Sequence, residues 1–335
     1  MGEEVTHLIF HNPNIRYGFH IRKDKTLYRS FDAKIGGPLT AYQIYLGNGH
    51  SLKPPVVSAT DILQTRTLFE RSGMYGCIHG SLLYNIAGAT NEKDVDRLWP
   101  LTEKSLVTEL DYAAGFGAGV VVHMGSCKKH DVGISRVVTT IENSLKLDGD
   151  VTSSLRKELQ MPDIKSKRKI ILENSAGEGS KFGSNLEEIG EIISMVDESV
   201  RDQVKVCIDT QHIFGAGEYD FGIPDEFDRF IETFEEHIGL EKLELFHLND
   251  SRAKFHAKKD RHEYLGIGYI FGEERESEGY GLSGLKYLVE FAEEKKIPLI
   301  GEPPAKTAEG KPGLGGMWDY SVVNELCNLA ECTCL

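Results

Sequence analysis

The sequence predicts an α/β protein with a (β/α)8 fold, the TIM barrel, on three observations. Short apolar, β-branched runs alternate with longer amphipathic stretches along nearly the whole chain. Eight such runs occur, and their consecutive apolar positions are typical of parallel strands buried on both faces. Six of the eight end on a His, Asp or Glu, as expected where barrel strands converge on an active site. The predicted strands are Ile15–Ile21, Ala41–Leu46, Met74–His79, Ala118–His123, Lys169–Glu173, Val204–Asp209, Leu243–His247 and Ile297–Glu302.

The stretches between these runs predict the helices and loops of the barrel. Helix-like patterns cover Ser184–Val200, Pro224–Ile238 and Leu282–Lys295, and residues 126–167 are expected to hold one helix plus an irregular loop. Residues 1–14 are expected to be an N-terminal extension, and residues 15–335 a single barrel domain. Residues 271–281 are predicted to be a solvated acidic insertion, and 303–316 a surface loop before a last helix near Trp318–Leu329. A doubly wound open sheet is the alternative with the same alternation.

Composition limits the classes of protein that the chain can belong to. No apolar run approaches the length of a membrane span, and the start lacks a signal-peptide pattern, so we expect an intracellular protein that is not secreted. Cys77 and Cys207 lie inside apolar runs and predict buried free thiols, which fits a reducing compartment. The formal charge of −14 argues against a nucleic-acid partner, although the position of the charges matters more than their sum.

The six polar strand ends are the main candidates for chemistry. His, Asp and Glu make up 64 of the 335 residues, so six of them at strand ends exceed what chance would give. Each one alone is more simply explained as the N-cap of the next helix. Together they would point into one small space, where unpaired carboxylates would repel and metal cations are the simplest compensation. These residues are His79, His123, Glu173, Asp209, His247 and Glu302.

Two short motifs enlarge the set to nine candidate metal ligands. Asp209-Thr-Gln-His212 adds a His just beyond a strand end, and Asp260-Arg-His262 follows His247 after a loop. None of the nine is Cys, and nitrogen and oxygen donors favour a catalytic zinc or manganese site over a structural zinc site. Three divalent ions would carry +6 against four carboxylates, and the remaining +2 suits a phosphodiester and a hydroxide.

The motifs around these residues resemble those of the endonuclease IV proteins (AP endonuclease family 2). The resemblance runs from about Tyr17 to about Pro303, and seven motifs in order make it specific. It implies a DNA-repair enzyme of the base excision pathway that cuts double-stranded DNA on the 5′ side of abasic sites and also removes blocked 3′ ends. The motifs are HGSLLYNIA (79–87), VVVHMGS (120–126), ILENSAGEG (171–179), VCIDTQH (206–212), FHLNDSR (246–252), DRHEYLGIG (260–268) and PLIGEP (298–303).

The resemblance also implies three zinc ions per chain, with manganese as a partial substitute. One ion would take His79, His123 and Glu173, and a second would share Glu173 and take Asp209, His247 and Glu302. The third would take His212, Asp260 and His262. Catalytic roles then fall to Glu302, which would orient or deprotonate the attacking nucleophile, and to the shared Glu173.

The sequence departs from the family pattern at several positions. Relatives read DTCH where this chain has Gln211, and they carry a Tyr at the position of Leu82, followed by an apolar residue that matches Leu83. In the family these two side chains wedge into the duplex. Relatives also carry a penetrating Arg in the loop that follows the second strand, where His50 is the expected replacement. The alternative interpretation makes Leu82 and Leu83 ordinary core residues of a helix face.

Basic residues gather in one loop beside two of the candidate ligands. Phosphate contacts there would supply affinity for DNA in an acidic chain that we expect to act as a monomer, whereas a solvated loop is the simpler alternative. Three other functions remain open: a metal-dependent sugar isomerase or epimerase, a silent DNA-binding protein and a UV-damage endonuclease. For a sugar isomerase, His212, Asp260 and His262 would be surplus. The loop residues are Arg252, Lys254, Lys258, Lys259 and Arg261.

Overall fold

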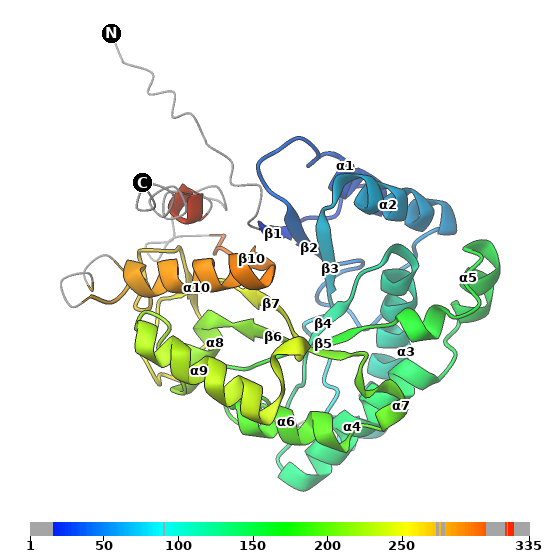
Figure 1. Cartoon of the computed structure of the whole chain (residues 1–335). Coiled ribbons are helices and arrows are strands. Elements are labelled where there is room, and N and C mark those ends of the chain that lie inside the picture. The colour runs from blue at the N-terminus through cyan, green and yellow to red at the C-terminus, as the bar shows by residue number, and fades with distance from the viewer. Residues whose placement is uncertain are drawn as a thin grey trace.

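Eight parallel strands close into a barrel that the helices surround (Figure 1). The computed structural model describes residues 16–89, 91–272, 275, 279–305, 319 and 321–324. The barrel order is β1-β10-β7-β6-β5-β4-β3-β2, which is the order along the chain closed on itself. The barrel strands are β1 (Tyr17–Ile21), β2 (Ala41–Ile44), β3 (Tyr75–His79), β4 (Val120–His123), β5 (Ile170–Glu173), β6 (Val204–Asp209), β7 (Leu243–His247) and β10 (Leu299–Gly301).

Every predicted strand is therefore present, and the predicted fold class is confirmed. The bounds of β6 and β7 agree with the prediction to the residue, and the other strands are shorter than the apolar runs that contain them. Two short strands, β8 (Asp250–Ser251) and β9 (His262–Glu263), pair antiparallel outside the barrel. They join the two ends of the loop that carries the predicted basic cluster.

The helices pack around the barrel. They are α1 (Leu27–Asp32), α2 (Ala59–Ser72), α3 (Glu92–Phe116), α4 (His130–Lys146), α5 (Thr152–Glu158), α6 (Leu186–Met195), α7 (Glu198–Arg201), α8 (Thr210–Ala216), α9 (Pro224–His237) and α10 (Leu282–Lys295), with 3-10 turns η1 (Ile164–Lys167) and η2 (Leu240–Lys242). In the described part of the chain, no helix combines the length and the apolar character that a membrane crossing requires.

Two helix predictions need correction. The expected single helix at Ser184–Val200 is broken, because Val196 is extended and the Asp197 side chain caps a new helix by accepting from the Ser199 backbone N–H. Residues 126–167 hold two α-helices and a 3-10 turn instead of one helix. Asp319 and residues 321–324 are helical, as expected for the last helix. The N-terminal extension, residues 273–274 and 276–278 of the acidic insertion, and most of the Gly/Pro/Lys loop lie outside the described residues.

The barrel interior is filled by one buried side chain from each of the strands β2 to β7 and β10. Cys77 and Cys207 are both buried there as free thiols, as predicted. This apolar plug closes the middle of the barrel, so that the polar strand ends form a separate layer at its carboxyl end. The plug consists of Ala41, Cys77, Val121, Ile171, Cys207, Leu245 and Ile300.

Candidate metal centre

The predicted metal ligands come together at the carboxyl end of the barrel in three adjacent sets. Within each set, one nitrogen or oxygen from every residue lies within 4.8 Å of the others. Glu173 and Asp209 each belong to two sets, so the sets are neighbours in space. The sets are His79, His123 and Glu173; Glu173, Asp209, His247 and Glu302; and Asp209, His212 and His262.

Glu173 at the end of β5 is the centre of the first two sets. Its Oε2 lies 3.3 Å from His79 Nε2 and 3.4 Å from His123 Nε2. Its Oε1 lies 3.0 Å from His247 Nδ1, which is also 3.5 Å from Glu302 Oε2. Although Glu173 is buried, its Oε2 has no hydrogen-bond partner. A buried carboxylate oxygen without a hydrogen bond is costly, and a bound cation would compensate it.

Asp260 lies between the two imidazoles of the predicted third site. Its Oδ2 is 3.3 Å from His212 Nε2, and its Oδ1 is 3.5 Å from His262 Nε2. Asp209 Oδ2 is 3.6 Å from the same His262 nitrogen, so the third set contains Asp209 in addition to the two predicted histidines, and the predicted Asp260 is a fourth residue beside it. His262 Nε2 is buried and has no hydrogen-bond partner. This set thus repeats the pattern of nitrogen and oxygen donors around an unsatisfied buried atom.

Three imidazole rings are oriented by backbone carbonyls. Nδ1 lies 2.7 Å from Gly80 O in His79, 3.0 Å from Asn174 O in His212 and 3.1 Å from Glu302 O in His262. Because a carbonyl only accepts, each Nδ1 must carry the proton and donate it. In the deprotonated form that binds a metal, each ring would turn the lone pair of Nε2 toward its set, which is the arrangement that metal-binding histidines adopt.

Asp209 shows that a helix cap and a ligand position are compatible. Its Oδ1 accepts from the backbone N–H groups of Gln211 and His212 at 2.7 and 3.0 Å and so caps α8. Its Oδ2 accepts from Asn249 Nδ2 at 2.8 Å and faces the donor sets. Oδ1 of Asp209 is therefore the helix N-cap that the sequence analysis gave as the simpler interpretation, and Oδ2 is available to a metal.

Two further polar residues at the centre were missed by the sequence analysis. Gln43 of β2 donates from Nε2 to Glu302 Oε1 at 2.7 Å, and its Oε1 lies 2.9 Å from His247 Nε2. His20 of β1 lies 3.1 Å from the same Gln43 amide and 3.5 Å from Glu302 Oε1. Both belong to the two strands that lack a polar end residue. A polar side chain inside an otherwise apolar strand was the signal that could have identified them.

The pKa values of the histidines and carboxylates at the centre depend on burial and on the charges of their neighbours. Burial lowers the pKa of His212, but the charges of Asp209 and Asp260 outweigh it and raise that pKa to about 10. Burial lowers the pKa of His123 to about 4, since Glu173 only partly offsets it. Burial raises the pKa of Glu302, and the nearby charge of His247 reverses the shift, so this pKa lies below its usual range. Protons on the histidines whose pKa is raised balance the negative charge of the carboxylates, and bound metal cations would balance the same charge.

Comparison with known proteins identifies the family. A family model described as a xylose isomerase-like TIM barrel matches residues 33–275. A probable endonuclease 4 from Halothermothrix orenii is 31% identical over 303 residues, which cover 89% of this chain and 96% of the relative. The chain belongs to the endonuclease IV family. The crystal structure of endonuclease IV from Thermus thermophilus superposes with a TM-score of 0.69 at 28% identity, covering 93% of this chain and 99% of the other.

The barrel itself is shared more widely than the endonuclease IV family. A D-tagatose 3-epimerase-like protein matches with a TM-score of 0.61 at 16% identity, over 96% of this chain and all of the other. This likeness shows the fold alone. It leaves the choice between an endonuclease and a sugar epimerase to the donor sets and to the loops around them.

The expected duplex-wedging residues of this endonuclease IV family member are exposed. Leu82 and Leu83 are 44% and 50% exposed, which argues against their interpretation as core residues. The turn that carries them is hydrogen-bonded to the loop that follows β2, because Leu82 N and Ser81 Oγ both donate to Gly49 O. His50, in the same loop, is also exposed. The two predicted lesion-contacting elements therefore lie side by side.

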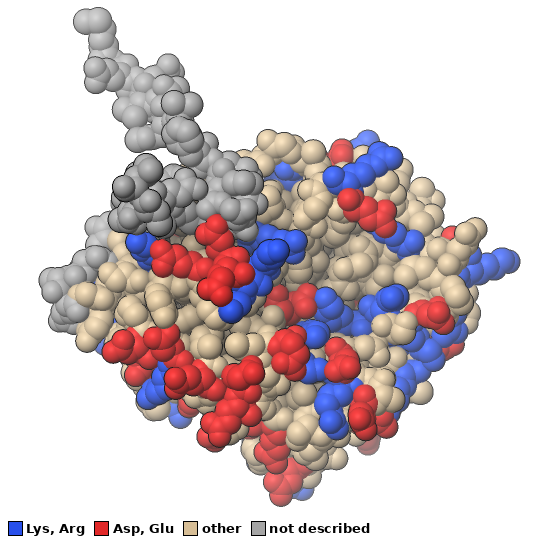
Figure 2. Space-filling model, viewed as in Figure 1, with Lys and Arg blue, Asp and Glu red and all other residues tan. Residues whose placement is uncertain are grey.

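The predicted basic loop runs between β8 and β9, beside the third donor set. Lys254, Lys258, Lys259 and Arg261 are exposed, and none of the four forms an ion pair within the described residues. Arg252 differs, because its Nε donates to Glu263 Oε2 at 2.8 Å. Acidic side chains gather elsewhere, over the outer helices at the lower left in the view of Figure 2. The basic loop thus places positive charge beside the donor sets of an acidic protein.

Proposed function

We propose that this chain is a zinc-dependent endodeoxyribonuclease that hydrolyses the phosphodiester on the 5′ side of abasic sites in double-stranded DNA. Membership of the endonuclease IV family supports the endonuclease class. The observation that carries the proposal further is the third donor set, in which Asp260 lies between His212 and His262. A sugar isomerase that uses one or two ions has no need for it.

Three zinc ions fit the three donor sets, and manganese can substitute in part. The first ion is assigned to His79, His123 and Glu173, and the third to His212, Asp260 and His262. The second is assigned to Glu173, Asp209, His247 and Glu302. Bound zinc supplies Lewis-acid activation of the phosphodiester and stabilises charge on the attacking and leaving oxygens.

Glu302 is the residue best placed to act on the attacking water. Gln43 fixes its Oε1 by a hydrogen bond of 2.7 Å, while its Oε2 faces the centre 3.5 Å from His247 Nδ1. A carboxylate held at one oxygen can use the other to orient water or to accept its proton. Its lowered pKa keeps it ionised, as a general base requires. Glu173 serves as the carboxylate shared by the first two sets.

The charge of the centre suits a phosphate ester better than a sugar. Four carboxylates, from Glu173, Asp209, Asp260 and Glu302, oppose the charge of three divalent ions and leave an excess of about +2. A phosphodiester and an attacking hydroxide neutralise this excess. The products are a 3′-hydroxyl and the abasic sugar phosphate, and the same site can hydrolyse 3′ blocking groups.

DNA binding is assigned to the exposed elements around the centre, in a monomeric enzyme. Leu82 and Leu83 would insert beside the displaced nucleotide, and His50 would enter from the neighbouring loop. The basic loop, with Arg252, Lys254, Lys258, Lys259 and Arg261, would contact phosphates. Replacing both leucines by Ala should weaken cleavage of abasic duplex without lowering thermal stability, because both side chains are largely exposed.

The experiment that separates an endonuclease from an epimerase combines metal analysis with two substrate classes. Purified protein is analysed for metal and incubated with a duplex oligonucleotide that carries one tetrahydrofuran abasic analogue, and separately with ketose sugars. About three zinc ions per chain and cleavage of the duplex alone support the proposal. One ion or none, with conversion of a ketose and no DNA cleavage, would replace it with a sugar epimerase.

A further inference from the structure

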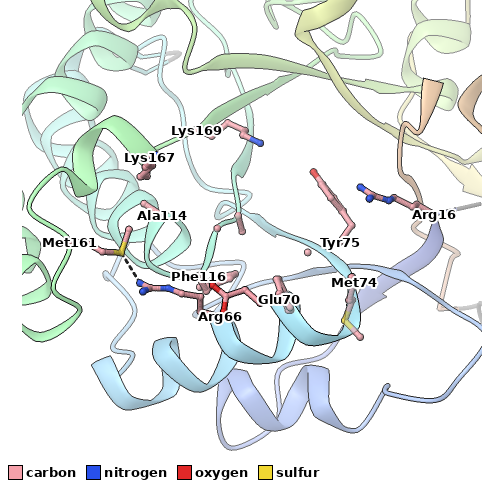
Figure 3. Close-up of a pocket in the computed structure, with 15 residues that line it drawn as sticks. Arg16, Arg66, Glu70, Met74, Tyr75, Ala114, Phe116, Met161, Lys167 and Lys169 are labelled. Atoms are coloured by element: carbon pink, nitrogen blue, oxygen red, sulfur yellow. Dashed lines mark hydrogen bonds between the residues drawn. The ribbon is translucent and has the colours of Figure 1, made fainter.

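A second pocket lies at the opposite end of the barrel from the metal centre. A cavity of about 600 Å³ is bordered by residues where strands begin: Arg16 precedes β1, Tyr75 opens β3 and Lys169 precedes β5 (Figure 3). Helix α2 and the C-terminal end of α3 complete its walls. The volume is within the range of pockets that hold small molecules.

The lining of this pocket is cationic, although the chain is strongly acidic. Arg16, Arg66, Lys167 and Lys169 line it, against a single acidic residue, Glu70. Within the described part of the chain, only Lys169 of these four contacts a carboxylate, and Arg66 is instead held by the carbonyl of Gly115 and the sulfur of Met161. Cations gathered in one cavity repel one another unless an anion compensates them.

One edge of the pocket already binds an anionic oxygen of the protein itself. Glu244 Oε1 accepts from Lys169 Nζ at 2.7 Å and from the Tyr75 hydroxyl at 3.2 Å. In Figure 3, the guanidinium of Arg16 points toward the same space as the Tyr75 hydroxyl and the Lys169 ammonium. The Tyr75 hydroxyl donates its one proton to Glu244, so a ligand oxyanion in this space can accept from the Arg16 guanidinium and from the remaining N–H groups of Lys169, as a phosphate would.

The remaining wall is apolar and fits a flat organic group. Phe69 and Met161 line the cavity together with Arg66, whose guanidinium is fixed in place by the end of α3. Aromatic rings bind favourably against a guanidinium plane and against thioether sulfur. A ligand for this pocket therefore combines an anionic head with an aromatic body.

We propose that this pocket binds a nucleoside monophosphate, with its phosphate near Arg16 and Lys169 and its base against Phe69 and Arg66, while Lys167 adds positive charge on the opposite wall. The cavity is larger than a bare phosphate needs, and it matches a single nucleotide. This site does not depend on the proposed nuclease activity, because no residue of the metal centre lines it. It would sense a product of nucleic-acid turnover at the end of the barrel remote from the DNA.

The test is calorimetric titration of the full-length, metal-loaded protein with dAMP. The informative variant is Arg16→Gln with Lys167→Gln, because both side chains are exposed and neither pairs with a carboxylate within the described residues. Lys286→Gln with Lys295→Gln, on α10, is the matched loss of two surface charges. We expect a dAMP site with a dissociation constant below about 1 mM, weakened about tenfold or more in the pocket double variant and unchanged in the α10 double variant.

Three outcomes would overturn the proposal. The first is the absence of dAMP binding by the wild-type protein. The second is equal binding by the wild type and the pocket double variant, which would place the nucleotide at the metal centre. The third is binding of inorganic phosphate as tight as that of dAMP, which would exclude an aromatic body. Thermal unfolding of each variant at the wild-type temperature ensures that a loss of binding reports the pocket and not the fold.

Discussion

The side chain of Gln211 holds the backbone on both sides of Asp260. Its Nε2 donates to Lys259 O at 2.9 Å, and its Oε1 accepts from Arg261 N at 3.2 Å. Gln211 stands in α8 and belongs to the Asp209-Thr-Gln-His212 motif, at the position where relatives read Cys. The departure from the family pattern thus has a structural role, because it fixes the exposed loop that brings Asp260 to the third donor set.

Replacing Gln211 by Met should loosen the third metal site and leave the other two intact. Without the two hydrogen bonds the loop carrying Asp260 gains freedom, and groups that orient metal ligands are typically worth about 10- to 100-fold in affinity. Zinc retention measured against a graded chelator should show one ion of three released more easily. Asp260→Asn is the positive control. Identical release of all three ions in Gln211→Met and the wild type would rule out this role.

Replacing Gln43 by Leu should weaken the second set. The amide joins His247 to Glu302, so its loss frees both the imidazole tautomer and the carboxylate. We expect zinc affinity at that set to fall roughly 10- to 100-fold. Gln64→Leu on the exposed face of α2 is the matched control. Unchanged zinc affinity together with full activity would show that Gln43 only fills space.

Glu109 should make stability depend on pH. Burial raises the pKa of this carboxyl to about 8, against opposing contributions from the Tyr84 hydroxyl and from His79. A carboxyl whose pKa is raised by folding adds stability that is complete below its unfolded pKa of about 4.3, and this contribution is lost as pH rises through about 8. Relative to wild type, Glu109→Gln should therefore gain stability as pH rises from about 4.3 to about 8. Urea unfolding at three pH values measures this, and a constant difference would contradict it.

The basic loop should set the salt dependence of DNA binding. Each cation that contacts a phosphate adds about 0.9 to the slope of log affinity against log salt. Lys258→Gln with Lys259→Gln should therefore reduce that slope by about 2, whereas Lys286→Gln with Lys295→Gln on α10 should leave it unchanged. Fluorescence anisotropy over a salt series gives both slopes. Equal slopes in the loop variant and the wild type would place DNA elsewhere.

Strand positions and strand-end ligands could be predicted because both follow from local patterns. An apolar run such as Val204–Asp209 indicates both a buried strand and the residue at its carboxyl end. The hydrogen-bonded partners could not be predicted in this way. Gln43 and His247 are far apart in the sequence and meet only because closure of the barrel brings the side chains of β2 and β7 together, although β1 and β10 lie between these strands. The break between α6 and α7 depends on one cap at Asp197, which the apolar periodicity does not reveal.

The most direct test is the position of the cut made in a duplex with one tetrahydrofuran abasic analogue, by the wild type and by Glu302→Gln, without added magnesium. The account predicts a single cut on the 5′ side of the analogue that leaves a 3′-hydroxyl. It also predicts a loss of at least about a hundredfold in rate for Glu302→Gln, with the undamaged duplex left intact. No cut by zinc-loaded wild type, or equal cutting by Glu302→Gln, would contradict it.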